Sequence, residues 1–194
     1  DAIFYEYISF VNFIASQFSI GRFWETGLPV EDEPYLKLKK TLRERNVGTD
    51  IFHEEMSPQV ISGVQIFILN PSPSSLMGKT LGQGHWSPSQ LNNQSLVMML
   101  QYKKTRILLA ADIEKEGEER MMKKGHALRA HVLKIPHHGS ASSSTPLFLQ
   151  RARPVYAILS VGERNIGRLP HPEVMKRYEQ WGSKIFRTDK HGAI

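Results

Sequence analysis

The chain has 194 residues, 40% of them hydrophobic and 23% charged, which are the proportions of a globular domain rather than of a disordered segment. It contains no cysteine, which excludes disulfides and zinc sites built on thiolates, and no apolar run approaches the ~18 residues of a membrane span. The formal net charge of +6 suits a partner rich in phosphate. Because this length supports one substantial core, we expect residues 1–194 to form a single domain.

Hydrophobic periodicity in the first half of the chain predicts helices and strands ahead of a long loop. Helices are expected over residues 10–18 and 34–46, and strands over residues 22–24, 51–52 and 64–69. Residues 70–90 are rich in Pro, Ser and Gly without periodicity, which predicts a loop. The aromatic start of the chain is better explained by burial, or by an interface, than by stacking on bases.

The second half of the chain alternates strands with helices. Strands are expected over residues 106–112, 131–135, 154–162 and 184–188, and helices over residues 113–124 and 172–181. The first strand, helix and strand of this series have the spacing of a βαβ crossover, which brings the carboxyl ends of both strands to one edge of a sheet. Open α/β sheets bind their ligands at that edge.

Two adjacent histidines lie where the strand over residues 131–135 ends. Pro136 cannot continue a strand ladder and Gly139 allows a sharp turn, so His137 and His138 are expected on a rim. Neutral imidazole is a common zinc ligand and carries protons near neutral pH. The pattern therefore suggests a metal site or acid–base chemistry, and the alternative is an ordinary surface loop.

Two further polar residues follow strand ends. Asp112 ends the preceding strand of the crossover, so its carboxylate can meet the two imidazoles and complete the mixed ligand set that zinc or manganese prefers. The alternative for Asp112 is an N-cap on the helix that follows it. His171 comes after the strand over residues 154–162, and capping of the helix that starts at Pro172 is its alternative role.

Several motifs together closely resemble the carboxy-terminal domain of the ComEC family, whose members are membrane channels for DNA uptake in natural competence. They are Leu-Leu-x-x-Asp-Ile-Glu at 108–114, Val-Leu-Lys-x-Pro-His-His-Gly-Ser at 132–140, Ser-Val-Gly-x-x-Asn at 160–165 and Pro-His-Pro-Glu-Val at 170–174. The resemblance includes residues 92–97, read as the strand before that of Asp112. It covers nearly the whole chain and is weakest over residues 47–88.

The resemblance implies an α/β fold, the αββα metallo-β-lactamase-like sandwich, whose strand ends converge on one or two zinc or manganese ions that hydrolyse phosphodiesters. It implies Asp112, His138 and His171 as metal ligands, His137, His138 and Ser140 as catalytic residues, and Lys134 and Asn165 as substrate-binding residues. It leaves open which of the two adjacent histidines binds metal and which contacts phosphate.

The chain departs from this family at its start. Metallo-β-lactamase domains carry an early His-x-His/Asp-x-Asp-His cluster that supplies roughly half of the metal ligands. In one alignment Ala2, Phe4, Glu6 and Tyr7 occupy those positions, and Glu6 alone keeps a carboxylate. In another alignment, residues 1–2 are the tail of a cluster whose first histidine lies upstream. We therefore expect weak or single-site metal binding, and a sandwich incomplete at its N-terminal strands.

The family also implies partners and a location. DNA is the expected partner, together with the membrane-channel part of the same protein, in the bacterial inner membrane with this domain on the extracytoplasmic side. Lys103, Lys104 and Arg106 form a basic hairpin that is either a nucleic-acid contact or a solvated face, and the basic helix over residues 34–46 has the same two readings. Besides a nuclease, the alternatives are a degenerate fold that guides DNA without cutting it, and a small-molecule phosphoesterase, such as a choline-phosphate esterase, with an aromatic cage.

Overall fold

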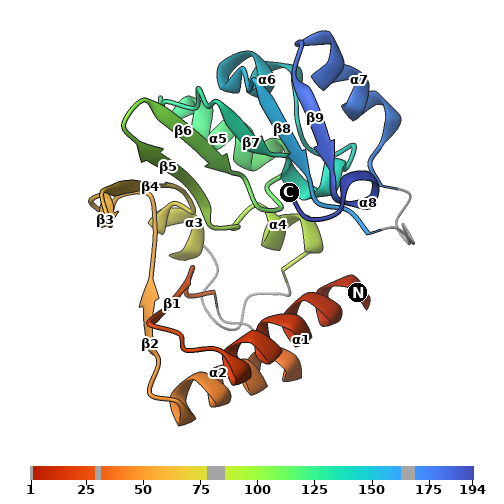
Figure 1. Cartoon of the computed structure of the whole chain (residues 1–194). Helices are drawn as coiled ribbons and strands as arrows, with labels where there is room; N and C mark the ends of the chain where they lie inside the picture. The colour runs from red at the N-terminus through yellow and green to blue at the C-terminus, as the bar shows by residue number, and fades with distance from the viewer. Residues whose placement is uncertain (1, 29–31, 78–85, 163–168) are drawn as a thin grey trace. The chain divides into compact units, whose positions relative to one another are not determined.

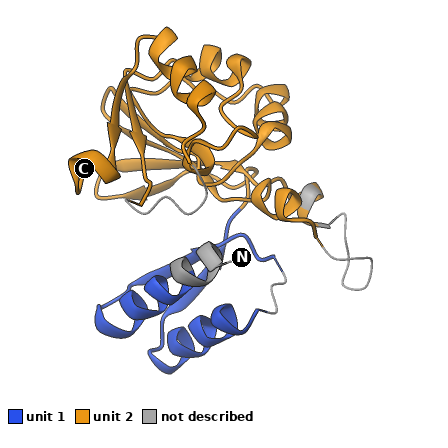
Figure 2. Cartoon of the chain, turned by 90° about the vertical axis from the view of Figure 1, so that its right-hand side faces the viewer, with its two compact units in different colours: residues 1–52 blue, residues 53–194 orange. Residues whose placement is uncertain are grey.

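The computed structural model describes residues 2–28, 32–77, 86–162 and 169–194, the side chains of residues 2–7, 75 and 77 excepted. The chain forms two compact units, residues 1–52 and residues 53–194, which are coloured separately in Figure 2 and are described here one at a time. The expected single domain over residues 1–194 stays a prediction. No described helix is long and apolar enough to cross a lipid bilayer.

The first unit pairs two helices with two short strands. Its elements are α1 (Ala2–Gln17), β1 (Arg22–Glu25), α2 (Glu33–Glu44) and β2 (Gly48–Ile51), and the two strands are parallel. Pro34 in the first turn of α2 has the fixed φ that starts a helix. Leu38 and Leu42 lie one turn apart and are buried together with Ala15 of α1. Both expected helices are confirmed, and α1 begins earlier than predicted.

The second unit is built on a mixed sheet of seven strands in the order β3-β4-β5-β6-β7-β8-β9 (Figure 1). The strands are β3 (Gln59–Ile61), β4 (Val64–Asn70), β5 (Val97–Tyr102), β6 (Thr105–Leu109), β7 (Val132–Lys134), β8 (Tyr156–Leu159) and β9 (Lys184–Arg187). Neighbours from β3 to β6 are antiparallel, and neighbours from β6 to β9 are parallel. The predicted crossover between β6 and β7 is therefore confirmed.

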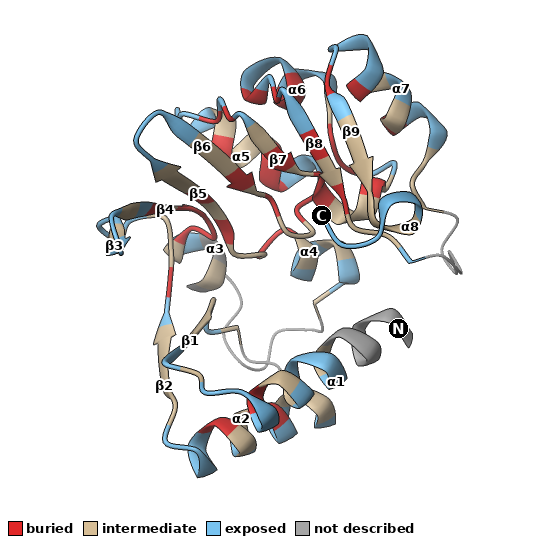
Figure 3. Ribbon diagram, in the orientation of Figure 1, coloured by how far each residue is buried: buried red, intermediate tan, exposed pale blue. Residues whose placement is uncertain are grey.

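Three helices connect the parallel strands: α5 (Lys115–Lys123), α6 (Pro146–Ala152) and α7 (Pro172–Gln180). The strands follow one another across the sheet in chain order, so right-handed crossovers place all three helices on the same face (Figure 1). The main apolar core lies between these helices and the sheet, with buried residues on the strands and on the helices (Figure 3). The fold is thus α/β, compatible with an α/β sandwich.

The predicted loop over residues 70–90 contains helical turns. Its ends hold α3 (Pro73–Met77) and the start of α4 (Pro88–Asn92), which begins with a capping box between Ser87 and Gln90. The strand expected over residues 92–97 is wrong, because the chain turns after α4 and β5 begins at Val97. Asn93 is buried in that turn, where its Oδ1 accepts hydrogen bonds from the N–H groups of Glu114 (3.1 Å) and Gly117 (2.8 Å). Asn93 therefore accepts hydrogen bonds from backbone N–H groups at the start of α5 instead of extending a strand.

A buried ion pair joins the segment before β3 to the end of α5. The Glu54 side chain is only 4% exposed and lies 3.0 Å from both Lys124 Nζ and His126 Nε2. Burial raises the pKa of Glu54, but the hydrogen bonds and charges of His126 and Lys124 outweigh it, so the pKa lies below the ordinary glutamate value. The folded protein therefore favours the ionised carboxylate.

We expect this pair to make stability depend on acidity. Since the folded-state pKa is lowered, the pair stabilises the fold above the ordinary glutamate pKa, and this contribution is lost as the pH falls through the folded value. Glu54→Gln should lower the free energy of unfolding by about 1–3 kcal/mol at neutral pH and by much less in strong acid, measured by urea denaturation. The exposed neighbour gives the control Glu55→Gln. Equal losses for Glu54→Gln at both pH values would contradict the expectation.

Candidate functional site

The carboxyl ends of β6, β7 and β8 lie at one edge of the sheet, and the turns that follow them are conformationally unusual. Ala111 after β6 has φ 47°, and His137 and His138 after β7 have φ 45° and 51°, in a short 3₁₀ turn over Pro136–Gly139. Non-glycine residues rarely adopt this left-handed conformation, which is typical of functional sites. The two turns are tied together, since the His137 N–H donates to the Ala111 carbonyl at 3.0 Å.

Asp112 and His138 face each other across these turns. Asp112 Oδ1 lies 3.4 Å from His138 Nε2 and 3.7 Å from Lys134 Nζ. His138 Nδ1 lies 2.7 Å from the Ser160 carbonyl oxygen, which can only accept a hydrogen bond, so the ring proton belongs on Nδ1. Burial and the Lys134 charge lower the pKa of His138, which favours the neutral ring. Nε2 of that ring is an electron-pair donor facing a carboxylate oxygen, an arrangement that suits a cation between them.

Lys134 reaches the same site from β7. Its ammonium group donates to the Ala111 carbonyl at 3.2 Å and lies beside Asp112. Burial lowers the pKa of Lys134, and the Asp112 carboxylate opposes that shift. The structure thus places a cation at the predicted substrate-binding position, next to the predicted metal ligand.

His137 belongs to a second polar group, with Glu114. The Glu114 Oε1 atom lies 3.5 Å from His137 Nδ1, and the Ser142 hydroxyl lies 3.4 Å from the same nitrogen. Ser140, predicted as catalytic, contacts this group through the Ser142 hydroxyl at 3.0 Å. Sequence reasoning did not assign Glu114 or Ser142 to the site, although the Asp-Ile-Glu motif contains Glu114 and was the available signal.

His171 joins the site through its backbone. Its N–H donates to the Gly139 carbonyl at 2.8 Å, and the residue occupies the N-cap position of α7 without a capping hydrogen bond from its side chain. Its ring Nδ1 is buried and has no hydrogen-bond partner among the residues that the structure describes. The alternative role of His171 is therefore confirmed in part: the residue lies at the N-cap position of α7, but its side chain does not cap the helix. For Asp112 the capping alternative is wrong, because Glu114 is the N-cap of α5.

The other predicted residues either lie outside the described part of the chain or belong to the basic hairpin. Asn165 lies outside the described residues, as does the side chain of Glu6. The basic hairpin joins β5 to β6, at the opposite end of β6 from Asp112. The Arg106 guanidinium donates to the Ala127 carbonyl, so it is engaged within the fold. In the described part of the chain, no three His, Asp or Glu side chains are placed to hold a metal ion together.

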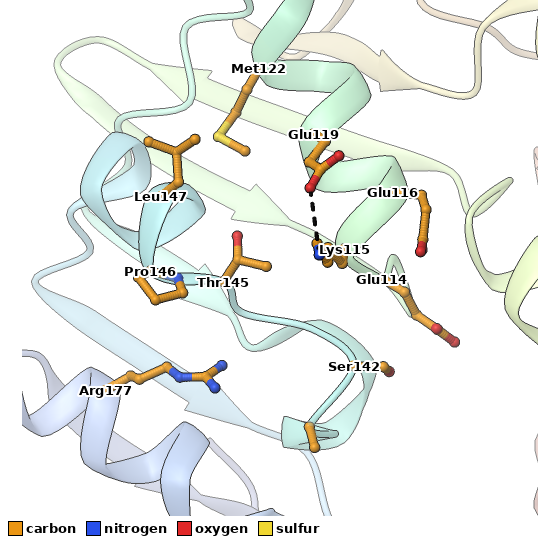
Figure 4. A pocket seen from close by; sticks show the side chains of 11 residues that line it. Glu114, Lys115, Glu116, Glu119, Met122, Ser142, Thr145, Pro146, Leu147 and Arg177 are labelled. Atoms are coloured by element: carbon orange, nitrogen blue, oxygen red, sulfur yellow. Dashed lines mark ion pairs between the residues drawn. The ribbon is translucent and has the colours of Figure 1, made fainter.

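A groove of about 560 Å³ begins beside this site and runs between α5 and α6 (Figure 4). Glu114 and Ser142 line its end, and Glu116, Glu119 and Leu147 line its length. Its described lining carries both signs of charge, with three glutamates and the cations Lys115 and Arg177. None of the described residues that line it is aromatic.

No family model matches the chain. Curated proteins do match: the chain is 36% identical to ComE operon protein 3 of Bacillus subtilis over 107 residues, and 36% identical to Competence protein ComA of Neisseria gonorrhoeae over 104 residues. It is also 31% identical to Recombination protein 2 of Haemophilus influenzae over 103 residues. Over about half of its length, the chain is homologous to these proteins of the ComEC family.

The ComEC homology covers just over half of this chain: 55% for the Bacillus protein and 53% for each of the other two. The chain spans only 14%, 15% and 13% of the lengths of these three relatives, respectively. The sequence-based resemblance to the ComEC family is thereby confirmed over about half of the chain, and its extension to nearly the whole chain stays a prediction.

Proposed function

We propose that the chain is the metallo-β-lactamase-like domain of a ComEC-type protein and that it hydrolyses phosphodiester bonds of DNA during natural competence. The observation that carries this proposal is the Asp112 carboxylate facing the neutral His138 ring at 3.4 Å, at the carboxyl edge of parallel strands. The homology to proteins named for competence supplies the DNA context.

Asp112 and His138 are the residues that would hold a zinc or manganese ion. His171, the third ligand that the resemblance implies, is anchored next to His138 by its backbone, but its side chain forms no three-ligand group with theirs in the described part of the chain. When bound, such an ion lowers the pKa of a water molecule and neutralises charge on the phosphate. The chain's own residues would bind the substrate and transfer protons. The Ser160 carbonyl orients the His138 ring, and the Lys134 ammonium attracts the phosphate. His137 acts as the general acid or base, close to Ser140 and Ser142. With so few ligands, we expect less than one tightly held metal ion per chain by elemental analysis.

The direct test is cleavage of linear DNA by the purified chain, with manganese added or with a chelator. We expect cleavage that requires the metal and disappears with the chelator. Absence of cleavage under every metal condition would overturn the hydrolase proposal.

A second candidate is a module that guides DNA without cutting it. It is favoured by the lack of a three-ligand group in the described residues and by the exposed side chains of Lys103 and Lys104. For this candidate we expect DNA binding that survives chelation and weakens steeply with salt. A small-molecule phosphoesterase has less support, because the groove beside the site offers no aromatic cage among its described lining residues.

We also infer that the membrane channel belongs to other parts of the same ComEC-type protein. The domain would then lie on the extracytoplasmic side of the bacterial inner membrane, where it meets incoming DNA. Protease accessibility of the domain in intact spheroplasts tests this location, and protection from protease would contradict it.

A further inference from the structure

The Glu114 carboxylate, which lies beside His137, also accepts hydrogen bonds from two other side chains. Its Oε2 accepts a hydrogen bond from the Ser89 hydroxyl at 2.8 Å, and its Oε1 accepts one from Asn92 Nδ2 at 2.8 Å. Both donors come from α4, and the side chain is only 10% exposed. The Glu114 N–H is also bonded, to Asn93 Oδ1. The hydrogen bonds from Ser89 and Asn92 fix the orientation of the buried carboxylate in the structure.

His137 is also fixed in place, by its backbone and by its contact with Glu114. Its backbone N–H is bonded to Ala111, its φ of 45° fixes the turn, and its Nδ1 lies 3.5 Å from Glu114 Oε1. An ionised carboxylate accepts hydrogen bonds and donates none. The Ser142 hydroxyl lies 3.4 Å from the same nitrogen and can also accept a hydrogen bond. With the Glu114 carboxylate 3.5 Å away, a ring proton is therefore favoured on Nδ1, which leaves the electron pair on Nε2.

We propose that Glu114 is a positioning residue that fixes the orientation and tautomer of His137, so that Nε2 is the nitrogen presented to the substrate. The inference rests on the proposed hydrolase function and extends it to a residue with no assigned role. It gives the two adjacent histidines distinct supports: the Ser160 carbonyl for His138, and the α4-clamped carboxylate of Glu114 for His137. The Asp-Ile-Glu motif would then serve both rings, with Asp112 facing one and Glu114 the other.

The test is Glu114→Gln in the full chain, read by the ¹⁵N chemical shifts of the histidine rings without added metal. The His137 signal is assigned by its loss in His137→Gln. We expect the Nδ1–H tautomer of His137 in the unmodified protein and a shift toward the Nε2–H tautomer in Glu114→Gln. Glu119→Gln is the matched control on the same helix, since Glu119 contacts Lys115 and not His137.

Activity gives the second readout. Glu114→Gln should lower the turnover of metal-stimulated cleavage about 10- to 100-fold with little change in KM, because the ring remains but is no longer held. Asn92→Ala keeps the charge and removes one bond of the clamp, so it should shift the same tautomer more weakly, and it serves if Glu114→Gln does not fold.

The outcomes separate this inference from the proposed function. An unchanged His137 tautomer in folded Glu114→Gln, or in Asn92→Ala if the first variant does not fold, would overturn the positioning role whatever the activity. A shifted tautomer in a protein that never cleaves DNA would support the positioning role and overturn the hydrolase proposal instead.

Discussion

Replacing Asp112 by asparagine should reduce metal-stimulated DNA cleavage by about 100-fold or more, because a neutral amide would hold less tightly the metal ion that would neutralise charge on the phosphate. The amide has nearly the same volume but no charge, and it would leave Lys134 Nζ and His138 Nε2 without the carboxylate that faces both. Initial rates of cleavage at saturating manganese measure the effect.

The Asp112 variant should still fold. Its side chain is 42% exposed, so its ion pair with Lys134 contributes little to stability. The backbone N–H of Asp112 keeps its bond to the Ser95 hydroxyl at 3.3 Å. Glu179→Gln, an exposed change on α7, controls for loss of one negative charge. If Asp112→Asn retained cleavage within threefold of the unmodified chain, Asp112 would have no part in the reaction.

Gly139→Ala should destabilise the second unit by about 2–5 kcal/mol, the sum of left-handed backbone strain and a steric overlap. Gly139 has φ +78°, and a methyl group there would lie 2.6 Å from Pro170 Cβ. The same glycine accepts the His171 N–H, so the two turns that carry His138 and His171 would be pushed apart. Urea denaturation measures the loss in free energy of unfolding.

The chain offers a matched control for this change. Gly125 has nearly the same backbone angle, φ +76°, but a methyl group there meets nothing within 4 Å. Gly125→Ala should therefore cost only the backbone strain, about 1 kcal/mol. Similar losses in the free energy of unfolding for the two variants would show that the close approach of Pro170 to Gly139 adds no steric cost.

The sequence predicted the edge at which the site lies, because that prediction rests on local patterns. Apolar runs at 106–112 and 131–135 with a polar helix between them define a crossover, and a crossover brings Asp112 to His138 without further information. The turn chemistry at Pro136 and Gly139 was equally local.

The contacts that sequence reasoning missed are those between polar residues far apart in the chain. The resemblance assigned Asn93 to a strand, but its side chain accepts hydrogen bonds from the start of α5, more than 20 residues later. The basic helix shows the same limit. Lys39 pairs with Glu25 at 2.7 Å, and Arg45 donates to the Ala15 carbonyl at 2.9 Å. Both charges therefore have partners within the first unit, which neither the solvated-face nor the DNA interpretation of this helix included. Composition records such charges but not their partners.

The separation between the basic hairpin and Asp112 sets a minimum size for any duplex that touches both. Seven residues separate Lys104 from Asp112, and the five of them that form β6 alone amount to about 17 Å at ~3.4 Å per residue. Duplex DNA rises ~3.4 Å per base pair, so about five base pairs are needed to cover that span. Shorter oligonucleotides would reach the lysines or the carboxylate, but not both at once.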